Sequence, residues 1–160
     1  MERTSKYSKD RPLKKAHRNI SRVGVYGVAL RDEQILLITQ QKGPYAGKFD
    51  LPGGGIEFGE TIEEALHREF LEEVGMDFED MKLMTNLTCK VDVLEPDDPY
   101  TFHQIGLIYS VTNLQILRLG SLQSQWVDMG ALQKDQTSPF LQMVLISCPI
   151  FSHSLLKEFL

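Results

Sequence analysis

The chain has 160 residues, 42% of them hydrophobic, which is enough for one globular domain with its own apolar core. The apolar stretch at 143–151 is too short to span a bilayer, and the hydrophilic N-terminus does not resemble a secretory signal. The net charge is −5, and the two cysteines, Cys89 and Cys148, lack metal-ligand spacing. These features predict buried reduced thiols and a cytoplasmic protein that does not enter a membrane.

The charge is unevenly distributed. Residues 1–18 contain seven basic and two acidic residues, so this segment carries +5 and the remainder −10. A basic segment on an acidic domain could contact RNA, but no aromatic or groove motif accompanies these charges. We therefore expect residues 1–19 to form a solvated, flexible arm, and residues 20–160 to form the domain.

The first predicted elements are two strands within residues 22–41, which are rich in Val, Leu and Ile and turn at 31–33. Residues 42–55 contain several glycines and prolines and predict a loop. A helix is predicted over 62–74, because Thr61 is a suitable N-cap and Glu64 completes a capping box with it. Gly75 stands where a helix-ending glycine is expected.

Two further strands are predicted at 81–94 and 101–112, and a strand or turn around Trp126. Helix starts are predicted at 128–135 and 138–146. Strands flanked by helices indicate an α/β or α+β layered domain. The apolar stretch at 140–160 is expected to cover the sheet as a second helix, or else to pack across a homodimer interface.

The predicted helix at 62–74 has an apolar stripe bordered by acidic residues. Residues four positions apart predict the core-facing stripe: Ile62, Leu66, Phe70 and Val74. Glu69, Glu72 and Glu73 follow i, i+3, i+4 spacing beside it, so their carboxylates should converge on one small cation such as Mg²⁺. A solvated acidic face is the alternative, but partial burial makes mutual repulsion costly. Arg68 can hold one carboxylate by a charge-assisted hydrogen bond.

Residues 54–76 resemble the Nudix box, G-x5-E-x7-R-E-U-x-E-E-x-G-U, where U is a bulky apolar residue. All seven fixed positions match: Gly54, Glu60, Arg68, Glu69, Glu72, Glu73 and Gly75. The preceding "FDLPGG" resembles the family's W-x-x-P-G-G segment, and "SQWVDMGAL" resembles its late Trp-containing turn. The resemblance covers residues 20 to about 145. It implies the Nudix fold, in which a mixed β-sheet is sandwiched between helices.

The resemblance also implies an enzyme that hydrolyses a diphosphate linkage in a nucleoside diphosphate linked to a group X, using Mg²⁺ or Mn²⁺. Matching positions imply these metal ligands: Glu69, Glu72, Glu73 and the Gly53 carbonyl. Glu69 also matches the general base of some members. Arg68 and Glu60 would orient the ligating glutamates. The metal would neutralise the diphosphate and lower the pKa of bound water.

One position departs from the family pattern. Many members carry an acid shortly before the late Trp, whereas residues 119–126 contain none. Either Glu69 alone serves as the base, or an acid from another loop replaces the missing one: Asp92, Glu95, Asp97 or Asp98. His103 is expected to be structural rather than to contact substrate. Aromatic residues on or near loops are candidates for base stacking: Tyr45, Phe49, Phe58, Tyr100 and Phe102.

The identity of X stays open between a nucleoside triphosphate and a nucleotide-sugar-like diphosphate. Positions 91–93 lack the Pro and Tyr that mark relatives acting on ADP-ribose and on dinucleoside polyphosphates. Two other functions remain possible: a nucleotide-sensing module without turnover, and an RNA 5′-end pyrophosphohydrolase that uses the basic arm. The clustered glutamates argue against the sensing module, because a sensor does not need them.

Overall fold

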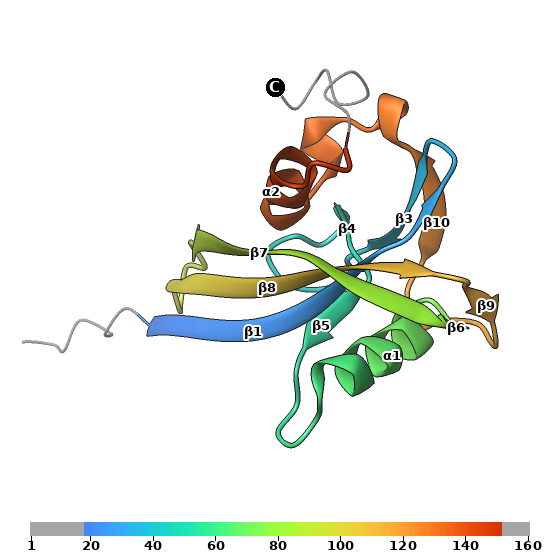
Figure 1. Ribbon diagram of the computed structural model, residues 1–160. Coiled ribbons are helices and arrows are strands. Elements are labelled where there is room, and N and C mark those ends of the chain that lie inside the picture. The colour runs from blue at the N-terminus through green and yellow to red at the C-terminus, as the bar shows by residue number, and fades with distance from the viewer. Residues whose placement is uncertain (1–17, 152–160) are drawn as a thin grey trace, which may run out of the picture.

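The structure, a computed structural model, describes residues 18–151. A curved sheet lies between two helices, with α1 (Ile62–Glu73) on one face and α2 (Pro139–Ser147) on the other (Figure 1). This is the layered architecture that the sequence predicts. Residues 1–17 of the predicted arm at 1–19, and the last part of the C-terminal stretch, lie outside the described residues.

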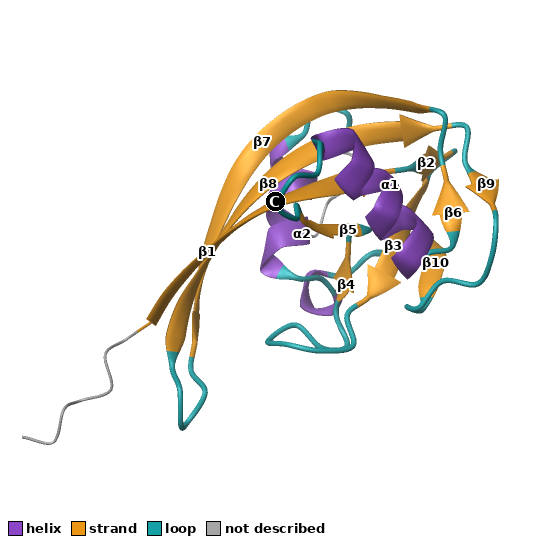
Figure 2. Ribbon diagram, turned by 90° about the horizontal axis from the view of Figure 1, so that it is seen from below, coloured by secondary structure: helices purple, strands orange, loops and turns teal. Residues whose placement is uncertain are grey.

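The main sheet has the order β5–β1–β8–β7 and mixes parallel with antiparallel pairing. Its strands are β1 (Arg18–Val28), β5 (Gly53–Gly55), β7 (Asp80–Val93) and β8 (Tyr100–Thr112). β1 runs parallel to β8, while β5 and β7 are antiparallel to their neighbours. Figure 2 shows that β1, β7 and β8 extend together beyond α1 at the end where β1 begins.

A second sheet has the order β10–β3–β2, and β4 also pairs with β3. Its strands are β2 (Leu30–Arg31), β3 (Gln34–Thr39), β4 (Phe49–Asp50) and β10 (Ser124–Asp128). Two further short strands pair with each other, β6 (Met76–Asp77) and β9 (Gln115–Ile116). Trp126 lies in β10, as the prediction of a strand or turn allowed.

The helix that carries the acidic residues begins and ends where the sequence predicts. The Thr61 hydroxyl accepts a hydrogen bond from the Glu64 backbone N–H at 3.2 Å, and the Glu64 carboxylate accepts one from the Thr61 N–H at 2.8 Å. This reciprocal capping box fixes the N-terminus of α1. Gly75 follows the helix with φ +71°, a left-handed conformation that glycine adopts without strain.

Each helix packs a phenylalanine onto a glycine of the main sheet. A Cβ atom added to Gly27 of β1 would lie 2.3 Å from the Phe70 ring, and one added to Gly106 of β8 would lie 2.4 Å from the Phe140 ring. Both rings are fully buried. The two glycines therefore set how closely α1 and α2 approach the sheet, and each helix completes a separate apolar core.

Several predictions of local structure need correction. The predicted loop at 42–55 contains β4 and β5, because the three glycines of β5 pair with β1 where side chains would clash. Residues 128–135 begin two short 3₁₀ helices, Met129–Ala131 and Lys134–Gln136, rather than an α-helix. Strand β1 begins at Arg18, inside the predicted arm, because its first residues pair with β8.

The apolar stripe of α1 is confirmed except at its start. Leu66, Phe70 and Val74 are buried, but Ile62 is 36% exposed. Ile62 lies on the buried side of the helix when about 100° is counted per residue, but it is the first residue of α1, where packing is less complete. Within residues 18–151, α1 and α2, with 12 and nine residues, are too short to cross a membrane.

Candidate active site

The three glutamates of α1 that were predicted to converge do not all face the same way. Glu69 and Glu73 line a cavity of about 340 Å³ together with Gly53 and Gly54 of β5. Glu72 does not line this cavity, and 53% of its side chain is exposed. On a helix, Glu72 lies about 100° from Glu73, beyond the edge of the buried face. The structure thus brings together two of the three glutamates that the sequence predicted to converge.

The glycines of β5 allow these carboxylates to approach the backbone. The Gly53 N–H donates a hydrogen bond to Glu73 Oε2 at 2.8 Å, and Gly53 has φ +139°, which side chains rarely adopt. A Cβ atom added to Gly54 would lie 2.5 Å from Glu69 Oε1. The run of glycines therefore leaves room for two carboxylates where any larger residue would displace them.

Arg68 connects the predicted positioning residues. Its Nε donates to Glu60 Oε1 at 2.6 Å and its Nη2 to Glu60 Oε2 at 3.0 Å, a bidentate pair. Its Nη1 donates to Glu69 Oε1 at 2.9 Å, and Nη2 also reaches the Gly55 carbonyl at 3.0 Å. The Arg68 guanidinium holds the pKa of the Glu60 carboxyl low, at about 2. Arg68 therefore ties Glu69 to Glu60 and to β5, whereas its contact with Glu72, at 3.6 Å, is longer.

The cavity concentrates negative charge. Burial raises the pKa of Glu73 to about 8, with smaller contributions in the same direction from Glu69 and Asp50. Burial also raises the pKa of Asp50 to about 6, although hydrogen bonds from the Leu51 N–H, Ser138 and Gln40 oppose this rise. Buried like charges are costly unless a cation joins them, so the site favours a bound cation.

The oxygen donors of the site fit Mg²⁺ or Mn²⁺. Carboxylates and backbone carbonyls are the ligands that these ions prefer, and Mg²⁺ usually keeps waters or substrate phosphates in its remaining positions. Within residues 18–151, no three Asp, Glu, His or Cys side chains stand close enough to form a complete metal site as arranged. Glu72 points outward and Glu69 accepts a hydrogen bond from Arg68, so Glu69 and Glu73 form the protein's inward-facing part of such a site.

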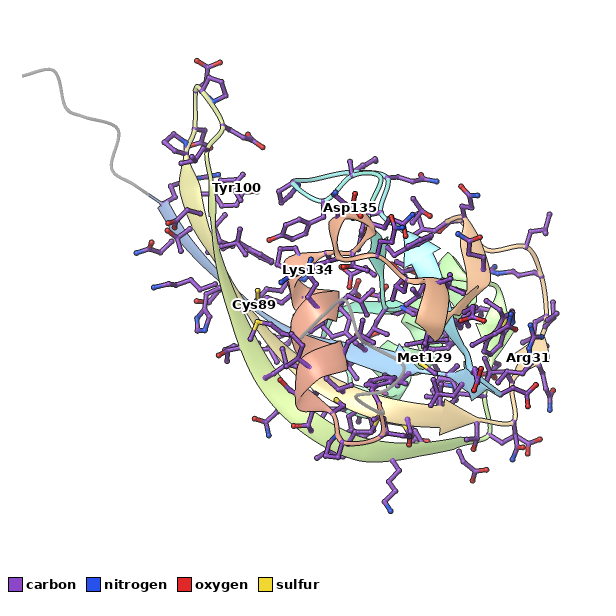
Figure 3. The ribbon with its side chains drawn as sticks, turned by 90° about the horizontal axis from the view of Figure 1, so that it is seen from above. Arg31, Cys89, Tyr100, Met129, Lys134 and Asp135 are labelled. Carbon is purple, nitrogen blue, oxygen red and sulfur yellow. The ribbon has the colours of Figure 1, made fainter. Side chains whose placement is uncertain are left out.

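Aromatic and amide side chains form much of the remaining cavity wall: Tyr26, Gln40, Tyr45, Tyr100, Phe102 and Gln104. Alternation along β8 places Tyr100, Phe102 and Gln104 on one face, which is the cavity face. Tyr100 lies near the end of β8 that adjoins the β7–β8 turn (Figure 3). Gln104 donates a hydrogen bond to the Tyr26 hydroxyl at 2.7 Å, which fixes its amide. A flat ring could stack in this part of the cavity.

The remaining aromatic candidates and His103 lie elsewhere. Phe49 is in β4 and packs against the core on the α2 side, while Phe58 is fully exposed on the turn before α1. His103 alternates with Phe102 and Gln104, so it faces away from the cavity, and its Nδ1 lies 3.5 Å from the Ser21 hydroxyl. The expectation that His103 does not contact substrate agrees with this geometry.

None of the four proposed replacement acids lines the cavity. Asp92 accepts a hydrogen bond from the Thr101 hydroxyl at 2.6 Å, and Asp98 forms an ion pair with Arg18 at 2.7 Å. Glu95 and Asp97 lie in the turn between β7 and β8. The further acid in the cavity is Asp50, which the sequence analysis missed. The sequence around Asp50, "FDLPGG", carries no local signal of its burial, because alternation along a strand places an acid between two apolar residues on the opposite face from them.

Comparison with known proteins agrees with this geometry. The pattern of the NUDIX domain matches residues 20–144 of the chain. A crystal structure of a MutT NUDIX hydrolase from Burkholderia pseudomallei superimposes with a TM-score of 0.62 and 24% identity, covering 87% of this chain and 98% of that one. This likeness shows the fold.

Three curated relatives match shorter segments. An ADP-ribose pyrophosphatase of Methanocaldococcus jannaschii is 45% identical over 74 residues, which are 46% of this chain and 44% of the relative. An RNA pyrophosphohydrolase of Blochmanniella pennsylvanica is 37% identical over 54 residues, 34% and 33% of the two chains. The nucleoside triphosphatase NudI of Escherichia coli is 43% identical over 51 residues, 32% and 33%.

These matches span less than half the length of the curated relatives. The NUDIX pattern itself covers most of the chain and includes every residue that lines the cavity around Glu69 and Glu73. With the fold and the box arranged as described, the chain belongs to the NUDIX domain family.

Proposed function

We propose that this protein is a Nudix-type pyrophosphohydrolase that uses Mg²⁺ or Mn²⁺ to cleave the diphosphate linkage of a small nucleotide substrate. The observation that carries the proposal is the cavity in which Glu69 and Glu73 meet the glycines of β5, beside aromatic walls. A cation among the carboxylates would hold phosphates at one end, and a nucleobase would stack at the other.

In this proposal, a metal would be held by the carboxylates of Glu69 and Glu73 and by the carbonyl of Gly53. Glu72 joins them by rotating away from Arg68, a movement that its exposed side chain permits. When bound, the metal neutralises the diphosphate and makes water a stronger nucleophile. Arg68, anchored by Glu60, keeps Glu69 oriented, and Glu69 accepts the proton of the attacking water through the oxygen that Arg68 does not occupy.

For the substrate, we favour a nucleoside triphosphate or a nucleotide-sugar-like diphosphate. The relatives carry names for ADP-ribose, RNA and nucleoside triphosphates, so they do not select one class. The cavity of about 340 Å³ is at the lower end of the range for small-molecule sites and suits a single nucleoside. Activity on RNA ends is the second candidate, since residues 1–18 carry a net charge of +5.

An assay across substrate classes tests this proposal. Purified full-length protein is incubated with Mg²⁺ or Mn²⁺, or with EDTA, and with nucleoside triphosphates, nucleotide sugars, ADP-ribose or triphosphorylated RNA, and the released phosphate or pyrophosphate is measured. We expect metal-dependent cleavage of a small nucleotide that is lost in Glu73→Gln and retained in Glu63→Gln, whose side chain is 71% exposed. Nucleotide binding without turnover of any substrate would instead identify a sensing module.

A further inference from the structure

Arg22 of β1 lies directly over the glycine strand of the candidate active site. A Cβ atom added to Gly55 would lie 2.5 Å from Arg22 Nε and 2.8 Å from Arg22 Nη2. The guanidinium therefore rests on the backbone of β5, one residue beyond Gly54, which contacts Glu69. Gly55 leaves the space that this position of Arg22 requires.

Within residues 18–151, Arg22 differs from the other arginines near the site in having no acidic partner. Arg68 is paired with Glu60 and Glu69, and Arg18, on the same face of β1, is paired with Asp98. Among residues 18–151, Arg22 forms neither an ion pair nor a side-chain hydrogen bond. Arg22 nevertheless lines the same cavity as the carboxylates of Glu69 and Glu73.

Arg22 also lies at a boundary between two cavities. The first is the cavity of about 340 Å³ with the aromatic wall. The second, of about 500 Å³, is more open and includes Ser21, Gly55 and Glu57 in its lining. Arg22 and Glu69 line both cavities. A substrate with a nucleoside on one side of a diphosphate and X on the other would cross this boundary at its phosphates.

We propose that Arg22 binds the phosphate that lies at this boundary, with the nucleoside in the aromatic cavity and X in the open one. The inference rests on the function proposed above. A guanidinium without an acidic partner offers several N–H donors in a planar arrangement that matches phosphate oxygens. Glu69 and Glu73 hold the metal from the helix side in this arrangement, and Arg22 holds the phosphate from the sheet side.

The competing explanation is that Arg22 has only a structural role and covers the backbone of β5 with its aliphatic part. Two substitutions separate the explanations. Arg22→Lys keeps the charge and the aliphatic stem but loses the planar donors. Gly55→Ala keeps Arg22 itself and displaces its guanidinium. The backbone can accept this alanine because Gly55 has no left-handed φ, and the atoms that must move are the flexible end of the Arg22 side chain.

Binding of methylenediphosphonate, a diphosphate analogue that cannot be hydrolysed, provides a readout that does not depend on turnover. With Mg²⁺ present, calorimetry should show that Arg22→Ala weakens binding by about 10- to 100-fold, the range for a hydrogen bond to a charged group. Arg22→Lys should recover part of this loss, and Gly55→Ala should show a similar loss with an unchanged unfolding temperature. Arg31→Ala is the control for charge, since Arg31 stacks on Trp126 at 4.4 Å and lies at the far end of the molecule from Tyr100 (Figure 3).

Guanidinium ion gives a second test. Added guanidinium chloride, at concentrations below those that unfold the protein, should restore binding and turnover to Arg22→Ala and should not affect Arg31→Ala. Wild-type binding in Arg22→Ala would overturn the inference and leave the proposed function standing. A wild-type protein that neither binds the analogue with Mg²⁺ nor cleaves any nucleotide would overturn both.

Discussion

The two helices of this protein share a design and differ in what they bury. Each begins at a hydroxyl N-cap, Thr61 for α1 and Ser138 for α2, and each packs a phenylalanine onto a glycine of the sheet. The fully buried side chains of α2 are all apolar, whereas the buried face of α1 includes Glu69, at 9% exposure. The difference separates a helix whose buried side chains are purely apolar from one that brings a carboxylate to the candidate active site.

Burying carboxylates on α1 lowers stability, because a charged group loses its hydration when it leaves water. Other contacts offset part of this loss. The capping box stabilises the first turn, and Arg68 pairs with Glu60 and Glu69. Proteins often keep a locally destabilising group, such as a buried carboxylate, where function requires it, and the surrounding contacts hold it in place.

Matched core substitutions should affect stability alike and activity differently. Leu66 of α1 and Leu145 of α2 are both almost fully buried, so Leu66→Ala and Leu145→Ala should each destabilise the protein by about 2–5 kcal/mol. Turnover of the folded protein should fall only in Leu66→Ala, because that substitution loosens the helix that holds Glu69. Urea unfolding and kcat at low temperature measure the two effects, and an equal loss of kcat in Leu145→Ala would contradict the division between the helices.

Removing one buried charge should separate activity from stability on α1 itself. Glu73→Gln should lower kcat/KM by at least about 100-fold, since Glu73 is a proposed metal ligand and such a ligand contributes several kcal/mol to transition-state stabilisation. The metal-free variant should be at least as stable as the wild type, because a neutral amide replaces a half-buried acid. Thermal unfolding in EDTA measures this, and a clear destabilisation would show that the Glu73 carboxylate supports the fold.

The buried acids predict how the metal-free protein responds to pH. Glu73 has a pKa of about 8 in the folded protein against 4.5 as its ordinary value, so the folded state binds a proton more tightly than the unfolded one. Its contribution to stability is therefore present below about pH 4.5 and is lost as pH rises through 8. Asp50, with a pKa of about 6, acts in the same direction at lower pH.

In EDTA, the free energy of unfolding should fall by about 1–4 kcal/mol between pH 5 and pH 8.5. Added Mg²⁺ should restore most of this loss, and Glu73→Gln should show a smaller decline. A stability that rises over this range without metal would mean that Glu73 is already ionised and paired in the folded state.

The sequence predicts α1 better than the rest of the site, for physical reasons. A capping box, a periodic apolar stripe and a terminal glycine are local signals, and they gave both ends of the helix correctly. The resemblance to the Nudix box likewise supplied Glu60, Arg68 and Glu69, and Arg68 donates hydrogen bonds to both glutamates in the structure. The outward direction of Glu72 was missed because spacing along the chain shows which side chains are neighbours on a helix, but not how far the cavity reaches around it.

Arg22 and Asp50 were missed because their importance depends on strand pairing. Arg22 reaches the site only because β1 pairs antiparallel with β5 and Gly24 lies opposite Gly55. Asp50 becomes buried only when β4 joins β3 and the start of α2 covers it. Neither contact can be read from residues that are close in sequence. The same applies to Tyr100 and Phe102, which the sequence named without distinguishing them from Phe58.

Substitution of the two N-caps should give the smallest effects on stability. Here the larger effect is expected for α2, the helix without a buried acid. Thr61 is exposed, so Thr61→Ala should destabilise the protein by about 1 kcal/mol through loss of the capping box. Ser138 is fully buried, caps α2 through the Leu141 N–H at 3.0 Å, and also hydrogen-bonds the Asp50 carboxyl. Ser138→Ala should therefore cost more, about 1–3 kcal/mol, because it leaves a buried acid with fewer donors.

Urea unfolding of both variants at pH 5 and pH 8 separates these contributions. The loss in Thr61→Ala should be the same at both pH values, whereas the loss in Ser138→Ala should be greater at pH 8, where Asp50 is ionised and depends on its donors. Equal losses at the two pH values would mean that Leu51 and Gln40 alone hold Asp50. A greater loss at pH 8 would mean that α2, although it carries no acid of its own, helps to keep a charge in the cavity through its N-cap.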